Sequence, residues 1–509
     1  MHRRDFLGAV GAGLVVPWTD WRDGLQTQGM VWASATEAAA ALRAKRVSSL
    51  ELTRQALDRI DRLNPQLNAL VQVFRDQALA RAREADAAAA RDQWWGPLHG
   101  VPVTAKESFG IAGAPATAGA PFLRNNVPGQ DSIPVARLRR AGAVLLGSTN
   151  VPFMLGDWQS YNEIYGTSNN PWDRSRTPGG SSGGSAAALA AGIGHLSIGS
   201  DIGGSIRVPA HFCGVYGHKP TINVVPMEGH IPPLPGQSAP VLVDLPVGGP
   251  MARTATDLRL GLEVLGGPAE PASRAYRWTL PASRHTALRD FRIGMVLDDP
   301  ACPVTDDTRA VFERMAGALR QAGARITTGW PDGVDPRVQH QTYLYLLGTY
   351  FASGLPDSLE DQTRRAAARP DSSLQGIWNR AWTDPIARLQ RQGAVAERLQ
   401  AAWGRWFEQY DVFLLPTAFS PAVPHDHTPQ GSRRIATSSG SRDYMDLIWW
   451  ITGATLSGLP ATTAPAGLTA AGLPVGVQIV GPYLEDATPI AFAEALAGAI
   501  GGFKPPPGY

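Results

Sequence analysis

The chain has 509 residues, of which 44% are hydrophobic, and its formal net charge is only +2. This composition is typical of a soluble globular protein, and the near-neutral charge gives no electrostatic case for binding nucleic acid or an anionic membrane. Two cysteines, Cys213 and Cys302, are too few for a disulfide framework. Cys213 is expected to be a small core residue, and a bridge to Cys302 in an oxidising compartment is the alternative.

The first 17 residues combine paired arginines with a short, weakly apolar run. The run is too short to cross a bilayer as a helix. Arg3 and Arg4 followed by Phe6 and Leu7 resemble a twin-arginine export signal, and the alternative is a disordered basic arm. We interpret residues 1–30 as leader and linker. The protein is then periplasmic or extracellular, or cytoplasmic if the leader does not function.

Replacing Arg3 and Arg4 by lysine is expected to leave folded, active protein in the cytoplasm, because twin-arginine export reads that pair. Cell fractionation, with the activity measured in each fraction, checks this expectation. Normal export of the double-lysine variant would mean that the segment is a general secretory signal or no signal.

Beyond the leader, predicted helices alternate with short apolar runs. Ser48 and Glu51 stand in capping-box register and predict a helix over residues 48–63 that ends at Asn64-Pro65. The next predicted elements are a strand at 68–74, a helix at 75–92, a strand ending at Lys106, a helix at 132–141 and a strand at 143–147. Such alternation indicates an α/β sheet with helices on both faces, with active residues in loops at one end.

A single lysine, Lys106, ends the apolar, β-branched run of residues 100–106, which is typical of a buried strand. A surface lysine is the ordinary interpretation. Burial, however, disfavours the charged form of an amine. A neutral Lys106 could accept a proton.

Residues 151–172 mix aromatic with polar side chains ahead of the glycine-rich part of the chain. Phe153, Met154 and Trp158 are candidates to line a substrate pocket. Ordinary core packing explains each of them equally well.

Residues 177–220 contain two serine-bearing glycine clusters, at 179–184 and 203–205. Glycines allow backbone to approach closely, and consecutive free N–H groups form a concavity that holds negative charge. If the chain turns back after the apolar run 195–199, the amides of residues 202–205 face a charge that develops beside the Ser205 hydroxyl. That arrangement is an oxyanion hole next to its own nucleophile.

Three other interpretations of the clusters remain open. Ser181 fits the G-x-S-x-G nucleophile elbow, but a polar, proline-broken loop precedes it where the elbow needs a buried strand. A phosphate loop is disfavoured because no lysine follows the glycines and the G-x-G-x-x-G spacing is absent. Either cluster alone could also be a surface turn.

The motifs GGSSGGS, GSDIGGSIRVPA and GHKP, with GxPxxxK upstream, resemble the amidase signature family of serine hydrolases, and elements of its pattern run from about Ser34 to the C-terminus. The resemblance implies one α/β domain over residues 31–509, with the amidase signature fold of a central mixed β-sheet covered by helices on both faces. Residues 329–410 form a variable helical region, rich in aromatics, that either caps the substrate channel or simply packs. No metal or cofactor is implied.

By resemblance, Ser205 is the nucleophile, Ser181 follows a cis peptide bond and Lys106 is the base. The backbone amides expected to hold the oxyanion belong to Ile202, Gly203, Gly204 and Ser205. The side chains expected to fix this turn are those of Ser182, Asp201 and Arg207. The expected pocket residues are Phe153, Met154, Trp158, Gly179 and Gly180. Two positions depart from the family: Glu107, where Asp usually follows the lysine, and Thr455, near where many relatives carry Asn.

The sequence therefore predicts a serine amidase that converts a carboxylic acid amide to the acid and ammonia or an amine through an acyl-enzyme. One alternative is a glutaminase of the kind that supplies ammonia in an amidotransferase, which would be cytoplasmic and bound to partners. The other is a non-catalytic relative that binds amides or peptides. The expected partner is a small-molecule amide, without nucleic acid or stable membrane insertion, and a homodimer is left open.

Overall fold

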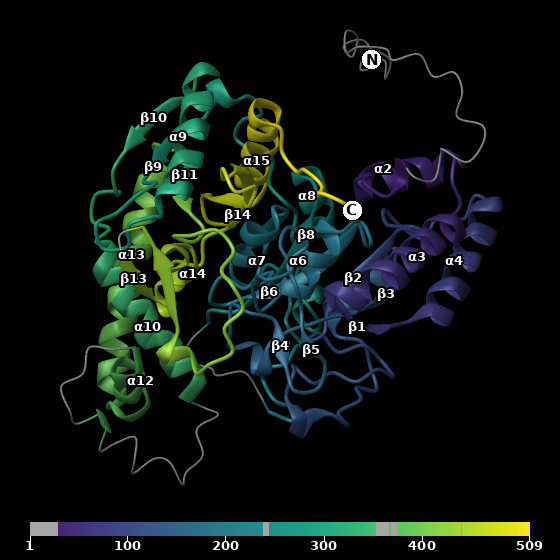
Figure 1. Ribbon diagram of the computed structural model, residues 1–509, viewed down its shortest axis with the longest axis horizontal. Helices are drawn as coiled ribbons and strands as arrows, with labels where there is room; N and C mark the ends of the chain where they lie inside the picture. Colours follow the sequence, from purple (N-terminus) through teal and green to yellow (C-terminus); the bar gives the residue numbers. More distant parts are fainter. Residues whose placement is uncertain (1–28, 238–243, 353–365, 368–373, 439) are drawn as a thin grey trace.

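The computed structural model describes residues 29–237, 244–352, 366–367, 374–438 and 440–509. Nearly all of the predicted leader, residues 1–28, lies outside these ranges. Within them, eleven strands form one sheet that runs through the molecule, with helices packed around it (Figure 1). No helix in the described ranges is long and apolar enough to cross a membrane.

In their order across the sheet, the strands are β1 (Leu70–Val73), β3 (Val144–Thr149), β2 (Pro102–Lys106), β6 (Leu196–Asp201), β8 (Val247–Ala252), β7 (Tyr216–Lys219), β14 (Ala461–Leu468), β15 (Pro474–Val480), β11 (Val412–Pro416), β9 (Arg292–Met295) and β10 (Arg325–Thr328). Strand β2 pairs in parallel with β3 and β6, and β9 pairs in parallel with β10 and β11. The remaining pairs are antiparallel. The sheet is therefore mixed, as the sequence predicts.

The helices are α2 (Ala35–Arg43), α3 (Ser49–Leu67), α4 (Arg75–Ala90), α5 (Ile133–Arg140), α6 (Gly183–Ala190), α7 (Arg207–Cys213), α8 (Ala255–Leu265), α9 (Asp306–Gln321), α10 (Pro336–Ala352), α12 (Leu374–Thr383), α13 (Ile386–Phe407), α14 (Thr452–Leu456) and α15 (Ala487–Ile500). Two short hairpins lie outside the main sheet: β4 (Tyr161–Asn162) with β5 (Gly166–Thr167), and β12 (Arg434–Thr437) with β13 (Gly440–Asp443).

The capping box at the start of α3 is present, but the predicted end of this helix is wrong. The Ser48 hydroxyl accepts from the Glu51 N–H at 3.1 Å, and the Glu51 carboxylate accepts from the Ser48 N–H at 2.7 Å. The helix continues past Pro65 and ends where Asn68 adopts a left-handed conformation, φ 46°. Asn68 still donates its N–H to the Asn64 carbonyl, so a proline this close to the helix end does not stop the last turn.

The parallel pairing of β2 with β6 brings two candidate active-site residues to the same end of the sheet, the carboxyl ends of these strands. Lys106 is the last residue of β2, and Asp201 is the last residue of β6. Helix α6 begins two residues after Ser181 and must approach this end closely. A Cβ at Gly184 would lie 2.4 Å from the Asn150 nitrogen and 2.5 Å from the Ala69 carbonyl oxygen, so only glycine fits there.

Both cysteines are buried and carry free thiols. Cys213 is fully buried in α7, where it packs with small and apolar residues as predicted. The pairing with Cys302 that an oxidising compartment could have allowed is not formed.

Candidate active site

Lys106 is fully buried at the end of β2 and is surrounded by hydroxyl groups. Its ammonium nitrogen lies 2.7 Å from Ser181 Oγ and 2.9 Å from Ser200 Oγ. Burial lowers the pKa of Lys106 to about 7, against an opposing effect of the Asp201 carboxylate. A large fraction of Lys106 is therefore neutral near neutral pH and can accept a proton.

The structure brings the two glycine clusters together. The peptide bond between Gly180 and Ser181 is cis. The next residue, Ser182, donates its N–H to the Ser205 carbonyl at 3.1 Å. The Ser182 hydroxyl lies 3.3 Å from the Ser200 carbonyl oxygen, at the end of β6. The first cluster is thus fixed against both the strand and the turn that carry the second.

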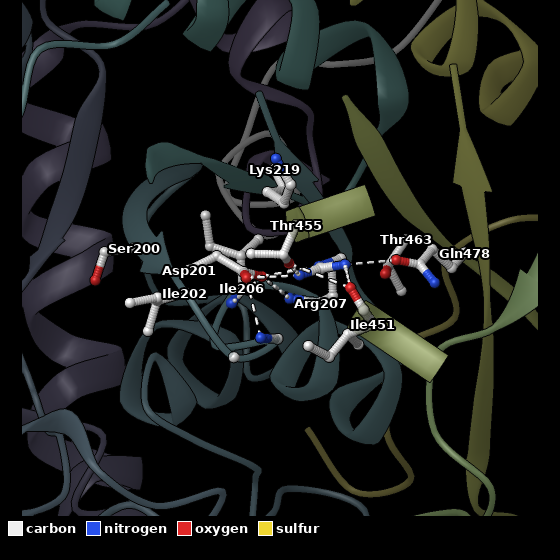
Figure 2. Close-up of polar contacts among 12 residues, drawn as sticks. Ser200, Asp201, Ile202, Ile206, Arg207, Lys219, Ile451, Thr455, Thr463 and Gln478 are labelled. Carbon is white, nitrogen blue, oxygen red and sulfur yellow. Dashed lines mark hydrogen bonds and ion pairs between the residues drawn. The ribbon is translucent and has the colours of Figure 1, made fainter. Parts of the chain in front are cut away.

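The turn after β6 is built around an ion pair between Asp201 and Arg207 (Figure 2). Arg207 contacts both carboxylate oxygens, at 2.8 and 3.0 Å, and both side chains are fully buried. The same carboxylate accepts the N–H groups of Gly204 and Ile206 at 2.9 and 3.1 Å. Burial alone would raise the pKa of Asp201, but the guanidinium and these donors lower it to about 2.

Arg207 is held in turn by a late segment of the chain. Its Nη1 donates to Gln478 Oε1 at 2.6 Å and to the Ile451 carbonyl at 2.9 Å. Its Nη2 donates to the Thr455 hydroxyl at 2.6 Å, as Figure 2 shows. Thr455, a departure from the family pattern, therefore supplies an acceptor for the buried guanidinium.

One predicted oxyanion donor is already engaged. The Gly204 N–H points at the Asp201 carboxylate, so our prediction that it faces the reaction centre is corrected. Sequence reasoning missed this because the acceptor is a side chain three residues earlier. The amides of Ile202, Gly203 and Ser205 remain as the expected donors.

Two aromatic side chains hold the carbonyls of this turn. The Tyr343 hydroxyl, from α10, donates to the Ile202 carbonyl at 2.7 Å, and the Trp158 indole N–H donates to the Gly203 carbonyl at 2.8 Å. In a trans peptide the N–H points opposite to the C=O, so Tyr343 sets the direction of the Gly203 amide. The contact also places α10, within the predicted helical region 329–410, directly on the turn.

The predicted pocket residues separate in the structure. Trp158 is buried on the turn, whereas Phe153 is 53% exposed and lies against Phe122, 6.4 Å between ring centres. Met154 packs on a small cluster around Ala116 and Ile231. Of these three candidates, only Trp158 contacts the turn.

Close backbone contacts require glycine at both Gly179 and Gly180. A Cβ at Gly180 would lie 2.3 Å from the Asp157 carbonyl oxygen. Gly179 has φ +90°, and a Cβ there would lie 2.7 Å from Pro209 Cα. That they line the substrate pocket stays a prediction.

A buried polar network supports the loop that carries Trp158. The Asp157 carboxylate accepts from the Tyr444 hydroxyl and from Arg433, each at 2.6 Å, and Arg433 also donates to the Tyr161 hydroxyl at 2.7 Å. Tyr444, Arg433 and Gln159 line a cavity of about 830 Å³. Lys106, Ser181 and Ser205 do not line it.

Sequence reasoning missed two residues beside Lys106, Ser200 and His230. Ser200 Oγ lies 2.9 Å from Lys106 Nζ and 2.9 Å from His230 Nε2. The proline-rich stretch that begins at His230 looks like a surface loop in the sequence, yet His230 is buried. The residues around His230 in the sequence do not indicate this position. A backbone bridge between His230 and Phe109 brings it to the segment that follows Lys106.

Two further histidines of this part of the chain, His211 and His218, have structural contacts. His211 contacts backbone groups of Gly476 and Ser420, and His218 contacts Thr462 and Asp486. Within the described ranges no group of three or more His, Cys, Asp or Glu side chains is placed to bind a metal.

Comparison with known proteins assigns the chain to a family. A family model described as amidase matches residues 51–489. The chain is 33% identical over 468 residues to an acylamidase of Rhodococcus erythropolis, covering 90% of this chain and 94% of that protein. It is also 33% identical over 501 residues to the A subunit of the glutamyl-tRNA(Gln) amidotransferase of Anaeromyxobacter sp. (strain K), covering 92% and 97%.

Among solved structures, that of a bacterial aryl acylamidase of the amidase signature family superposes with a TM-score of 0.77 at 25% identity, covering 92% of this chain and 96% of the other. The family model spans most of the chain, and the curated relatives exceed 30% identity over about nine tenths of it. The chain therefore belongs to the amidase signature family of enzymes.

Proposed function

We propose that the protein hydrolyses a carboxylic acid amide through an acyl-enzyme on Ser205, with Ser181 and Lys106 as its proton relay. The observation that carries the proposal is the fully buried Lys106 amine, 2.7 Å from Ser181 Oγ and with a pKa of about 7. The hydrogen bond from the Ser182 N–H to the Ser205 carbonyl supports it, because it keeps Ser205 next to the cluster that contains Ser181.

Amide resonance makes the carbonyl a poor electrophile and the amine a poor leaving group, so both an oxyanion site and a proton donor are needed. Neutral Lys106 takes the proton of Ser181, and Ser181 takes that of Ser205 as it attacks. The amides of Ile202, Gly203 and Ser205 hold the oxyanion. The relay then runs backwards to protonate the leaving nitrogen, and water activated by the same relay hydrolyses the acyl-enzyme.

The substrate class proposed is a small acyl or aryl amide, and the site of action is outside the cytoplasm. The acylamidase and aryl acylamidase relatives favour such substrates. The amidotransferase relative keeps a glutaminase as the second candidate, since its identity to this chain is equally high. Arg3 and Arg4 favour the exported enzyme, because an amidotransferase that acts on tRNA-bound substrates works in the cytoplasm.

A fluorophosphonate probe is expected to label Ser205, and Ser205→Ala should lower amide hydrolysis by a factor on the order of 10⁴ or more. Peptide mass mapping identifies the labelled serine, and turnover of an aryl amide measures the activity. Labelling confined to Ser181 would reverse the assignment and support the elbow interpretation. Absence of both labelling and turnover would favour a binding protein instead.

A further inference from the structure

His230 is a buried histidine whose two ring nitrogens face different kinds of group. Its Nδ1 lies 3.0 Å from the Pro232 carbonyl oxygen, and its Nε2 lies 2.9 Å from Ser200 Oγ and 3.0 Å from Ser108 Oγ. The ring packs edge to face on Phe109, with 4.7 Å between ring centres. The proposed relay makes no use of this residue.

These contacts fix the tautomer of His230. A carbonyl oxygen can only accept, so Nδ1 carries the proton and Nε2 offers its lone pair. Burial, followed by the nearby charge of Lys106, lowers the pKa of His230 to about 3. The ring is therefore neutral near pH 7. The one lone pair on Nε2 accepts a hydrogen bond from a hydroxyl, and Ser200 Oγ, at 2.9 Å, is the nearer of the two.

The tautomer dictates what Ser200 can do for Lys106. A hydroxyl has one proton, and that of Ser200 is directed at His230. Its oxygen, 2.9 Å from Lys106 Nζ, can then only accept from the amine. A neutral amine has two N–H bonds and one lone pair. With one N–H on Ser200 Oγ, the lone pair stays available for Ser181 Oγ, at 2.7 Å.

We infer that His230 is a positioning residue that acts through Ser200 to keep the lone pair of Lys106 directed at Ser181. The inference rests on the proposed function, since it assigns a direction to the same relay. No bond is made or broken at His230. Its effect is to prevent Ser200 from donating its proton to Lys106, which would occupy the lone pair that the relay needs.

The charged groups near His230, Ser200 and Lys106 are consistent with a neutral His230 ring. Asp201 is the carboxylate that favours the charged form of Lys106. Lys106 itself is the charge that acts on His230. Glu107 follows Lys106 in the chain, and its Oε1 accepts from Thr117 and Tyr165. Burial raises the pKa of this carboxyl group to about 7.

The test compares His230→Phe with His230→Gln. Phenylalanine keeps the ring against Phe109 but accepts no hydrogen bond, which frees the Ser200 proton for Lys106. We expect the plateau rate to fall on the order of tenfold. We also expect the midpoint of the pH–rate profile to move to lower pH, because a hydrogen bond donated to the lone pair of Lys106 stabilises the neutral amine. The amide oxygen of glutamine can accept from Ser200, so His230→Gln should recover both the rate and the midpoint.

Two rates are measured against pH: fluorophosphonate labelling of Ser205 and aryl amide hydrolysis. Ser108→Ala is the matched control, because it removes the other hydroxyl at Nε2 without touching Lys106. It should keep the wild-type midpoint. If His230→Phe does not fold, Ser200→Ala tests the other half of the contact: it removes the oxygen that accepts the Lys106 N–H, so the amine is no longer oriented and labelling should slow.

An unchanged rate and midpoint in His230→Phe, or in Ser200→Ala, would overturn the inference. So would a slower His230→Phe with an unmoved midpoint that glutamine does not rescue, since that result indicates packing alone. A wild-type protein that is neither labelled at Ser205 nor active on amides would instead overturn the proposed function.

Discussion

Lys106→Met is expected to lower amide hydrolysis by several orders of magnitude and, at the same time, to make the protein more stable below pH 7. Methionine matches the length of the lysine stem but cannot take a proton. The proposed relay then lacks its base, and the leaving nitrogen lacks its proton. Matched esters should lose less activity, because an alkoxide or phenolate leaves without protonation.

The gain in stability follows from the pKa of Lys106. The folded protein lowers it from 10.5 to about 7, so between these values the unfolded chain binds more protons and stability rises with pH. Below about pH 7 the folded protein carries the whole cost of burying the charge, on the order of 5 kcal/mol. Lys106→Met removes that cost but also loses the two hydrogen bonds of Lys106 to Ser181 and Ser200. The gain in stability over the wild type should shrink as the pH rises from 7 towards 10.

Lys219→Met is the matched control. Lys219 is also fully buried, donates to the Pro220 carbonyl at 2.9 Å and has its pKa lowered to about 7, chiefly by burial. Its replacement should give a similar gain in stability at pH 6 but keep amide hydrolysis. Urea unfolding at pH 6 and pH 9 measures the first effect, and initial rates measure the second. Near-native amide hydrolysis by Lys106→Met would contradict the relay.

Arg207→Met is expected to destabilise the protein by about 3–5 kcal/mol and to abolish activity. Removing one partner of a buried ion pair leaves the other charge uncompensated. Here Asp201 would remain fully buried, and it is the residue that fixes the Gly204 and Ile206 amides. The turn that holds the proposed oxyanion donors should lose its order along with the ion pair.

The pH dependence of unfolding separates this effect from simple loss of packing. In the wild type the pKa of Asp201 lies at about 2, below its usual 3.8. Its contribution to the free energy of unfolding is therefore complete above pH 4 and is lost as the pH falls through 2. Without Arg207 its pKa rises, and acid unfolding should begin at a higher pH. Thr455→Val, which removes one acceptor of Arg207, should cost only about 1–3 kcal/mol. Equal losses in both variants would argue against the ion pair as the anchor.

The sequence predicts most of the fold because the relevant signals are local. Two patterns each predict an element from a few neighbouring residues: the capping box at Ser48 and Glu51, and the apolar run that ends at Lys106. The structure has a helix and a buried strand at these places. The end of α3 is mispredicted, since a proline in the last helical turn reads in sequence like a stop.

The candidate site is predicted only where glycine-rich motifs mark it. Ser181 and Ser205 stand in such motifs, and Lys106 ends a recognisable strand. Ser200 stands in the motif GSDIGGSIRVPA, but sequence reasoning gives it no role there, and His230 reads as part of a surface loop 30 residues further along. Their roles come from contacts between segments that only the folded sheet brings together.

The turn at residues 202–204 takes its direction from two side chains of unrelated origin. Trp158 belongs to the loop before the first serine cluster, and Tyr343 lies 141 residues beyond the carbonyl it holds. Neither side chain is a reacting group. Tyr343 sets the direction of the Gly203 amide, an expected oxyanion donor, whereas Trp158 holds the peptide whose Gly204 N–H is bonded to Asp201. Libraries that vary Tyr343 in search of new substrates should therefore alter kcat more than KM, because the amide that is moved stabilises charge only in the transition state.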